Sequence, residues 1–275
     1  MLMFRVCLPI SHLLEQDSPP VRKILAQADV LELRRPILPE FIPAKPRVFH
    51  SGLGLVQEEF LSSFRKEGLD RFLDEAGIKM FSFDLGPSCR RNQYILPLSR
   101  TLALSEIKSE MARSLEAIRK SYQGQLAAEN YNYYPSGLYE HICRPDVIAH
   151  LLEFFDLKLV LDLAHATITA ANLNLNLKDY LAELPLDQTV EIHLSRPYLH
   201  PRIAVDAHAG PGADDYRLLG YVLDHLPHPE EVLVAIEYYR DLKRLSDHYC
   251  NLIEFKSRLK SDPHSRRTVL CRDLD

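Results

Sequence analysis

TVEIHLSRPYLHPRIAVDAHAGP, residues 189–211, contains two extended runs that carry residue types able to ligate metals. The first run leads to His193, and the second carries Asp206 and His208 two positions apart. On a strand, residues i and i+2 face the same side, so we expect the last two side chains to converge. A carboxylate with two imidazoles near strand ends favours a metal site. One such histidine alone is more often a hydrogen-bonded structural residue, so the prediction depends on similar residues arriving from other strands.

Short apolar runs of this kind recur along the whole chain and alternate with helix-length amphipathic segments. The runs cover residues 4–9, 29–34, 47–53, 79–85, 125–130, 157–165, 189–194 and 231–238. Eight such runs predict a (β/α)8 TIM barrel, an α/β fold. We expect one barrel domain over residues 1–260 and a basic, frayed tail over residues 261–275. A doubly wound open sheet is the alternative, but its usual G-x-G-x-x-G turn is absent from the sequence.

The segments between the runs give more local expectations. Residues 58–76 have helical spacing of apolar side chains and are interpreted as one helix. Ser105 is a candidate N-cap for the next long helix. Pro145 opens another helix at the position where proline fits best. The proline-rich residues 36–46 are expected to form a loop.

Composition limits the class of protein. Among the 275 residues, 46% are hydrophobic and 26% charged, which is typical of a globular domain with a full core. The net charge of -5 favours no nucleic-acid partner. Five scattered cysteines without a CxxC pair favour reduced thiols in a cytoplasm. No apolar run approaches the about 20 residues that span a bilayer, and the N-terminal run is interpreted as a strand.

The ends of the predicted strands carry the candidate site. Catalytic residues of such barrels lie at the C-terminal ends of the strands. From the third run onward these ends supply His50, Asp84, Glu129, Asn130, Asp162, His165, His193, Asp206, His208 and Glu237. Burying so many charges together is unfavourable unless cations neutralise them. Four histidines and five carboxylates, with no thiolate, suit two or three iron, manganese or zinc ions better than one zinc.

Structural alternatives exist for several of these residues. His50 could hydrogen-bond a loop, Asp84 could cap a turn, and His165 could cap the loop that follows it. Asp162 and Glu237 end very apolar strands, where a carboxylate without a partner is unfavourable, so ligation is the stronger interpretation.

Two arginines follow the fourth run, and other catalytic motifs are absent. Arg90 and Arg91 could receive an anionic substrate or a peptide terminus, or could be a solvated loop. The sequence has no G-x-S-x-G elbow, no P-loop and no H-E-x-x-H helix. The basic tail is more typical of a solvated end than of a nucleic-acid-binding arm.

Seven motifs carry a family resemblance: FHSGLGL, SFDL, ENYNYYPSGLYE, LVLDLAH, VEIHLS, VDAHAGP and LVAIEYYRDL. They resemble the multinuclear non-haem iron-dependent oxidases (MNIO), within the xylose-isomerase-like TIM barrels. The resemblance covers roughly residues 4–245. It implies a barrel that holds two or three iron ions, activates dioxygen and oxidises cysteine or nearby residues of a ribosomally made peptide. A partner protein for substrate recognition is also implied, because the chain has no separate peptide-recognition domain.

The resemblance also implies roles for individual residues. The implied ligands are His50, Glu129, Asn130, Asp162, His165, His193, Asp206, His208 and Glu237. Glu129 corresponds to a bridging carboxylate, and Glu129, Asp162 and His193 are the candidate catalytic residues. Asp84 and Glu140 are further candidates, either as ligands or as partners of ligands. Asp84 stands where the family pattern S-E-H-L has histidine, so a site for two metals is also compatible with the sequence.

Other functions remain compatible with the same barrel. A zinc- or manganese-dependent sugar isomerase or phosphodiester hydrolase would use one or two ions to polarise a carbonyl or activate water. Such an enzyme, or the oxidase itself, could act on a small molecule instead of a peptide. A binding module with a decayed site is the non-enzymatic alternative.

Overall fold

Eight parallel strands close into a barrel in the computed structural model, which describes residues 3–90 and 100–261. The strands are β1 (Arg5–Ile10), β2 (Val30–Leu33), β3 (Arg47–Gly54), β4 (Ile78–Asp84), β5 (Gln125–Glu129), β6 (Lys158–Asp162), β7 (Thr189–Leu194) and β10 (Leu233–Ile236). Their order around the barrel is β1, β10, β7, β6, β5, β4, β3, β2, and β1 pairs with β2 to close it. The predicted TIM barrel is confirmed.

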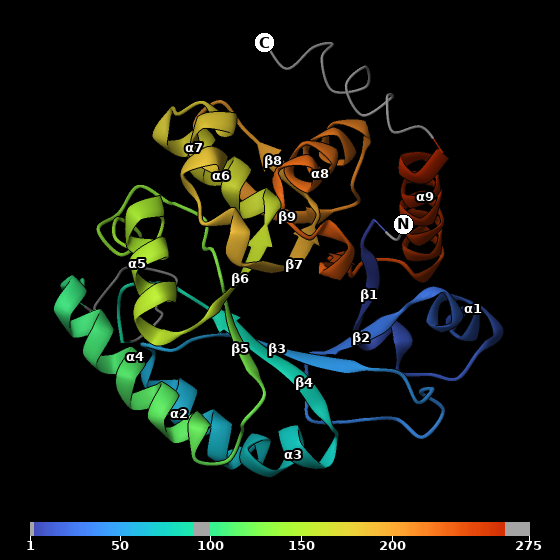
Figure 1. The fold of residues 1–275 in the computed structure, drawn as a ribbon, viewed down its shortest axis with the longest axis horizontal. Helices are drawn as coiled ribbons and strands as arrows, with labels where there is room; N and C mark the ends of the chain where they lie inside the picture. The colour runs from blue at the N-terminus through green and yellow to red at the C-terminus, as the bar shows by residue number, and fades with distance from the viewer. Residues whose placement is uncertain (1–2, 91–99, 262–275) are drawn as a thin grey trace.

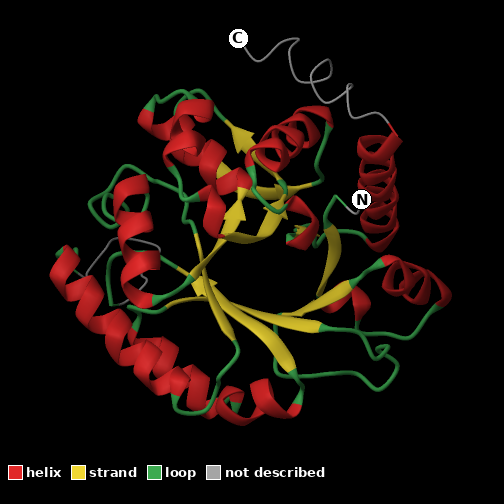
Figure 2. Cartoon of the chain, in the orientation of Figure 1, coloured by secondary structure: helices red, strands yellow, loops and turns green. Residues whose placement is uncertain are grey.

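Helices surround the strands on the outside (Figures 1 and 2). They are α1 (Pro19–Gln27), α2 (Glu58–Lys66), α3 (Leu69–Glu75), α4 (Leu104–Arg119), α5 (Pro145–Phe155), α6 (Leu163–Leu173), α7 (Leu177–Glu183), α8 (Ala213–His225) and α9 (Leu242–Ser261). Short 3-10 turns are η1 (His12–Leu14), η2 (Leu186–Gln188) and η3 (Pro229–Glu231). The connection from β2 to β3 is the predicted proline-rich loop and forms no helix.

Three sequence-based expectations differ from the structure. The single helix over residues 58–76 is two helices, because Gly68 has φ 68° and begins α3 in the left-handed region. Helix α4 begins at Leu104, and Glu106 accepts a hydrogen bond from the Ala103 backbone N–H at 3.0 Å, so Ser105 is not the N-cap. The sixth strand ends at Asp162 instead of His165. The expected tail begins at the last residue of α9, and residues 262–275 lie outside the described residues.

The barrel interior has two layers, because side chains alternate along each strand. The lower layer is mainly apolar and contains Cys7, Val30, Val48, Met80, Ala127, Val160, Leu233 and Ala235. Two positions further along seven of the strands, the inward-facing residues are Glu32, His50, Ser82, Glu129, Asp162, His193 and Glu237. All seven of these side chains are buried. The polar layer therefore lies at the C-terminal end of the barrel, where parallel strands deliver their last side chains.

A hairpin in the connection between β7 and α8 extends over this end. Its strands, β8 (Arg196–Leu199) and β9 (Ala204–Ala209), pair antiparallel. Asn172 of α6 holds β9 in place, because its side chain donates to the Ala204 carbonyl at 3.0 Å and accepts from the Ala204 N–H at 2.7 Å. The hairpin thus fixes the residues of β9 relative to α6.

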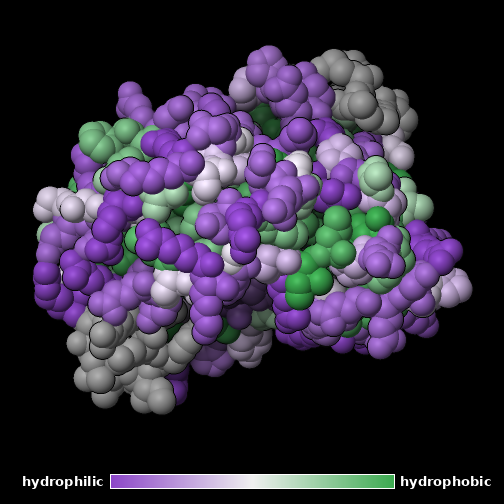
Figure 3. Space-filling model, turned by 90° about the horizontal axis from the view of Figure 1, so that it is seen from below, coloured by the Kyte–Doolittle hydropathy of each residue, from purple (hydrophilic) through white to green (hydrophobic). Residues whose placement is uncertain are grey.

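The outer face seen in Figure 3 is largely hydrophilic, with smaller hydrophobic areas between the polar residues. Among the described residues, no helix combines the length and apolar character needed to cross a bilayer.

Candidate metal centre

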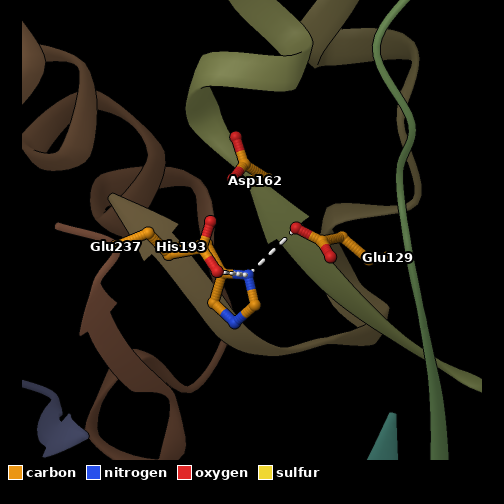
Figure 4. Close-up of side chains that lie close together, drawn as sticks. All are labelled: Glu129, Asp162, His193 and Glu237. Carbon is orange, nitrogen blue, oxygen red and sulfur yellow. Dashed lines mark hydrogen bonds and ion pairs between the residues drawn. The ribbon is translucent and has the colours of Figure 1, made fainter. Parts of the chain in front are cut away.

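Four buried side chains from four neighbouring strands meet in the polar layer (Figure 4). They are Glu129 of β5, Asp162 of β6, His193 of β7 and Glu237, which directly follows β10. One ligand atom from each lies within 4.8 Å of the other three. Asp162 is paired with His193 in the strand register, which brings these two side by side. None of the four side chains is more than 3% exposed.

His193 lies at the centre of this group and contacts carboxylates through both ring nitrogens. Its Nδ1 is 2.9 Å from Glu129 Oε1 and 3.6 Å from Glu237 Oε1. Its Nε2 is 3.0 Å from an oxygen of Glu32 on β2. Burial alone would lower the pKa of His193, but the three carboxylates around it raise that pKa well above its usual value. The carboxylates of Glu32, Glu129 and Glu237 therefore surround the His193 ring.

Glu129 also belongs to a second group of potential ligands, with His50 of β3 and Asp84 of β4. Glu129 Oε2 is 3.2 Å from His50 Nε2, while its Oε1 is the atom that contacts His193. Asp84 Oδ1 is 3.4 Å from the same His50 nitrogen. The two carboxylate oxygens of Glu129 thus face two different sets of ligand atoms, the arrangement that a bridging carboxylate requires.

The hydrogen bonds of His50 indicate which ring nitrogen carries the proton and which has the lone pair. Ser82 Oγ donates to the Phe49 carbonyl at 3.4 Å, so this hydroxyl oxygen accepts from His50 Nδ1–H at 3.0 Å. Burial is the largest cause that lowers the pKa of His50, to about 4. The Nε2 lone pair of a neutral His50 therefore points at the carboxylates of Asp84 and Glu129. Three electron-rich atoms facing one another are repulsive, and a cation between them turns that repulsion into coordination.

Three more predicted residues form the outer edge of the cluster. His208 Nδ1 lies 3.1 Å from Asp206 Oδ2, as the alternation of side chains on β9 predicts. His208 Nε2 lies 3.1 Å from Glu237 Oε2, which joins the hairpin to the buried group. His165 Nδ1 donates to the Asn130 carbonyl at 2.9 Å, leaving its Nε2 to face Asp206 at 3.7 Å. His165 reaches this position from the first turn of α6 and not from a strand end.

Asn130 orders the backbone of Asp162. Its side chain donates to the Asp162 carbonyl at 3.1 Å and accepts from the Asp162 N–H at 2.7 Å. Asp162 Oδ1 in turn accepts from the His165 N–H at 2.7 Å and caps α6. The other oxygen, Asp162 Oδ2, is buried and has no hydrogen-bond partner among the described residues. An unpartnered buried carboxylate oxygen is unfavourable, so this atom is available for a cation.

The charges of the centre do not balance by themselves. Within the described residues, six carboxylates (Glu32, Asp84, Glu129, Asp162, Asp206 and Glu237) share the centre with four imidazoles and one guanidinium, that of Arg34. Burial, the largest cause, raises the pKa of Asp162 to about 7 and that of Asp84 to about 6. Desolvation thus favours the neutral form of both carboxyl groups in the metal-free chain, whereas a bound cation would favour the carboxylates.

The remaining candidates lie elsewhere. Glu140 is exposed in a turn after β5 and belongs to none of the three ligand groups of the described residues. The Arg90 guanidinium is half-exposed and pairs with Glu110 of α4 on the outside of the barrel. Arg91 lies outside the described residues. The structure therefore does not bring Glu140 or Arg90 together with the strand-end cluster.

The sequence matches one family model over most of the chain. Residues 37–255 match the model described as "RiPP precursor modification enzyme MbnB/TglH/ChrH", where RiPP denotes a ribosomally synthesised and post-translationally modified peptide. The chain belongs to this family. The resemblance to the multinuclear oxidases drawn from the sequence motifs is thereby confirmed, and a RiPP precursor modification enzyme has a peptide as its substrate.

Solved structures similar to this RiPP-family enzyme share its fold at low sequence identity. Endonuclease IV from Thermus thermophilus is 17% identical with a TM-score of 0.61, covering 94% of this chain and 100% of that one. A 3-keto-D-glucoside 4-epimerase from E. coli is 15% identical with a TM-score of 0.59, covering 92% and 99%. An L-ribulose 3-epimerase is 13% identical with a TM-score of 0.54, covering 95% and 99%. These likenesses establish the xylose-isomerase-like barrel.

Sequence reasoning missed three residues of the centre in this RiPP-family enzyme. Glu32 binds His193, Arg34 pairs with both Glu32 and Glu237, and Tyr239 donates to Glu237 Oε1 at 3.1 Å. A signal for Glu32 existed, because it is a single carboxylate inside the apolar run VLEL, and it is completely buried. Its charge is balanced there: burial would raise its pKa, but Arg34 and His193 lower it to about 2.

A cavity of about 550 Å³ opens beside the metal centre at the ends of β1 and β2. Its apolar wall includes Leu33, Ile37 and Pro39. Its lining also includes Arg34 and Tyr239, the two residues that contact Glu237. The cavity therefore connects the surface of this RiPP-family enzyme to the edge of the candidate metal centre.

Proposed function

We propose that the protein is an iron-dependent oxidase that uses dioxygen to modify cysteine or a nearby residue of a ribosomally made peptide. One observation carries the proposal: Glu129 lies between two groups of buried ligand atoms, each able to hold a cation, in a chain of the RiPP precursor modification family. Imidazole and carboxylate donors without a thiolate in these two groups suit iron, with zinc or manganese as alternatives.

The residues present fit a centre of two or three ions. His50, Asp84 and Glu129 would hold one, and Glu129, Asp162, His193 and Glu237 a second. His165, Asp206 and His208 at the outer edge would serve a third or complete the second. The unpartnered Asp162 Oδ2 and the His50 Nε2 lone pair are the atoms that most need a cation. When bound, the iron ions would supply the electrons for dioxygen reduction and a Lewis acid for the substrate thiolate.

The protein's own side chains would orient the reaction. Glu32 accepts from His193 Nε2–H and so leaves Nδ1 to face the centre, an arrangement that fixes a ligating histidine. Arg34 and Tyr239 hold Glu237 at the border between the centre and the cavity. A peptide side chain in the cavity would approach past these two residues, while the apolar wall excludes water around it.

The purified protein is expected to contain more than one iron per chain. Elemental analysis after anaerobic purification measures this, and mass spectrometry then follows the Cys-containing peptide encoded nearest the gene. We expect a mass change in that peptide that requires both iron and dioxygen. The same peptide with cysteine replaced by alanine is the control. A mass change that persists in the control, or a fully active enzyme containing only zinc, contradicts the proposal.

The cavity is expected to bind the peptide. Ile37→Glu places a charge on its apolar wall, where Ile37 is 63% exposed. We expect the KM for the peptide to rise at least about tenfold, since each 1.4 kcal/mol of lost binding is a factor of ten, while the metal content is unchanged. Leu175→Glu is the matched control, because Leu175 is 50% exposed but lies outside the cavity lining. Equal KM values for the two variants would place the peptide elsewhere.

A further inference from the structure

A third group of potential ligands lies inside the barrel and extends from the polar layer down to the lower layer. It consists of Cys7 of β1, Glu32 of β2 and Glu191 of β7. The Cys7 Sγ and one carboxylate oxygen from each glutamate lie within 4.8 Å of one another. All three residues are 0% exposed. Glu191 precedes His193 by two positions on β7, which gives it the same inward direction one layer lower.

The two glutamates of this group differ in their partners. Glu32 is paired through one oxygen with Arg34 and through the other with His193. Neither oxygen of Glu191 accepts a hydrogen bond from a nitrogen or oxygen donor in the part of the chain that the structure describes. The Cys7 thiol does hydrogen-bond the Glu191 side chain, but a thiol is only a weak donor. A fully buried carboxyl group is thus directed into the cluster without an adequate partner.

A proton does not resolve this arrangement. A protonated Glu191 still needs an acceptor for its O–H, and a thiol sulfur is a weak one. Burying a polar group without a partner is unfavourable, and a buried polar group of this kind needs an explanation such as an ion. A cation would bind the Glu191 oxygens and the Cys7 sulfur together, because a metal-bound thiol is deprotonated.

We propose that Cys7, Glu32 and Glu191 form a separate, buried binding site for a divalent cation that binds thiolates, of the zinc or iron(II) class. One thiolate and two carboxylates carry three negative charges, and a divalent cation together with Arg34 balances them. Each carboxylate oxygen has two lone pairs, so Glu32 can bind the cation and keep His193. The site joins β1, β2 and β7 inside the barrel. It shares Glu32 with the strand-end centre through the contact to His193, and no step of the proposed oxidase reaction is assigned to it.

Cobalt(II) tests the site directly, because a thiolate bound to Co²⁺ gives a charge-transfer absorption that nitrogen and oxygen ligands do not give. The two strand-end ligand groups contain no cysteine, so among the three ligand groups of the described residues the buried one alone can give this signal. The protein is produced with Co²⁺ as the only added transition metal, in a Cys250→Ser background that removes the exposed thiol of the described residues. We expect the parent protein to show the thiolate absorption. Cys7→Ser should lose this absorption together with about one equivalent of bound cobalt.

Three further variants separate the possible outcomes. Cys143→Ser removes another buried thiol, which donates to the Tyr131 carbonyl at 3.3 Å, and should keep the absorption. Asp162→Ala weakens the strand-end centre and should also keep it, which distinguishes this site from that centre. Glu191→Gln should weaken the signal at least tenfold at limiting cobalt. The proposal is overturned if no thiolate absorption forms, or if it survives in a Cys7→Ser protein whose circular dichroism is unchanged.

Discussion

Glu129→Gln is expected to lose about two metal ions per chain, whereas Asp84→Asn and Asp162→Asn each lose about one. Glu129 is the residue that the two strand-end ligand groups share, with Oε1 at 2.9 Å from His193 and Oε2 at 3.2 Å from His50. A neutral amide keeps the size of the side chain but has one oxygen in place of two. Even partners of metal ligands lower affinity about 10–100-fold when replaced, so loss of a bridging ligand should exceed that.

The matched control is Glu110→Gln. Glu110 is a buried glutamate of α4 that pairs with Arg90 and Arg113, away from the centre. Its variant should keep the full metal content. Inductively coupled plasma mass spectrometry and thermal unfolding of all four variants provide the comparison. If Glu129→Gln loses no more metal than Asp162→Asn, Glu129 is not a bridge, and the two ligand groups do not bind ions together.

The sequence predicts the barrel because eight short apolar runs alternate with helix-length segments and no G-x-G-x-x-G turn indicates an open sheet. Most strands are short apolar runs, and on six of them the inward-facing residue changes from apolar to polar two positions further along, as in Val160 followed by Asp162 or Ala235 followed by Glu237. A period of two therefore locates both the apolar layer and the polar layer above it. The candidate ligands on β5, β6, β7 and after β10 could be predicted for this reason.

The rest of the centre could not be predicted, because it depends on tertiary neighbours. Arg34 reaches Glu237 across 203 positions of sequence, and Glu32 reaches His193 across 161. No local pattern encodes such pairs. The sequence predicts His165 at a strand end because apolar residues resume at 163 and 164 after Asp162. In the structure Asp162 caps α6, and His165 faces Asp206 from the first turn of that helix.

Glu191 is an exception to the two-residue alternation that predicts an apolar lower layer. It occupies the lower, otherwise mainly apolar layer of the barrel, where a carboxylate contradicts the alternation that explains its neighbours. Deviations of this kind are expected at functional sites, where local rules are broken for binding or catalysis. A sequence scan for charged residues at inward positions of the lower layer would have found it.

Asp162→Asn is also expected to stabilise the metal-free protein above neutral pH while weakening metal binding. Burial raises the pKa of Asp162 from 3.8 to about 7, so the folded chain keeps a proton that the unfolded chain releases. The contribution of Asp162 to the free energy of unfolding of the metal-free wild type is therefore most favourable below about pH 4. This contribution is lost as the pH rises through about 7. One pKa unit corresponds to about 1.4 kcal/mol, so the asparagine variant should be more stable by the order of 2–4 kcal/mol at about pH 8.

The asparagine can keep the existing contacts of Asp162, which makes the comparison clean. Its Oδ1 can still accept from the His165 N–H, and its uncharged amide nitrogen replaces Asp162 Oδ2, an atom that has no hydrogen bond to lose among the described residues. Urea unfolding of both metal-free proteins at about pH 5 and about pH 8 measures the difference, which should grow with pH. The exposed Asp224→Asn serves as control and should show no such growth. An asparagine variant that is less stable than wild type at both pH values would contradict this prediction. It would mean that contacts within the protein stabilise the charged Asp162 carboxylate and that its role is structural.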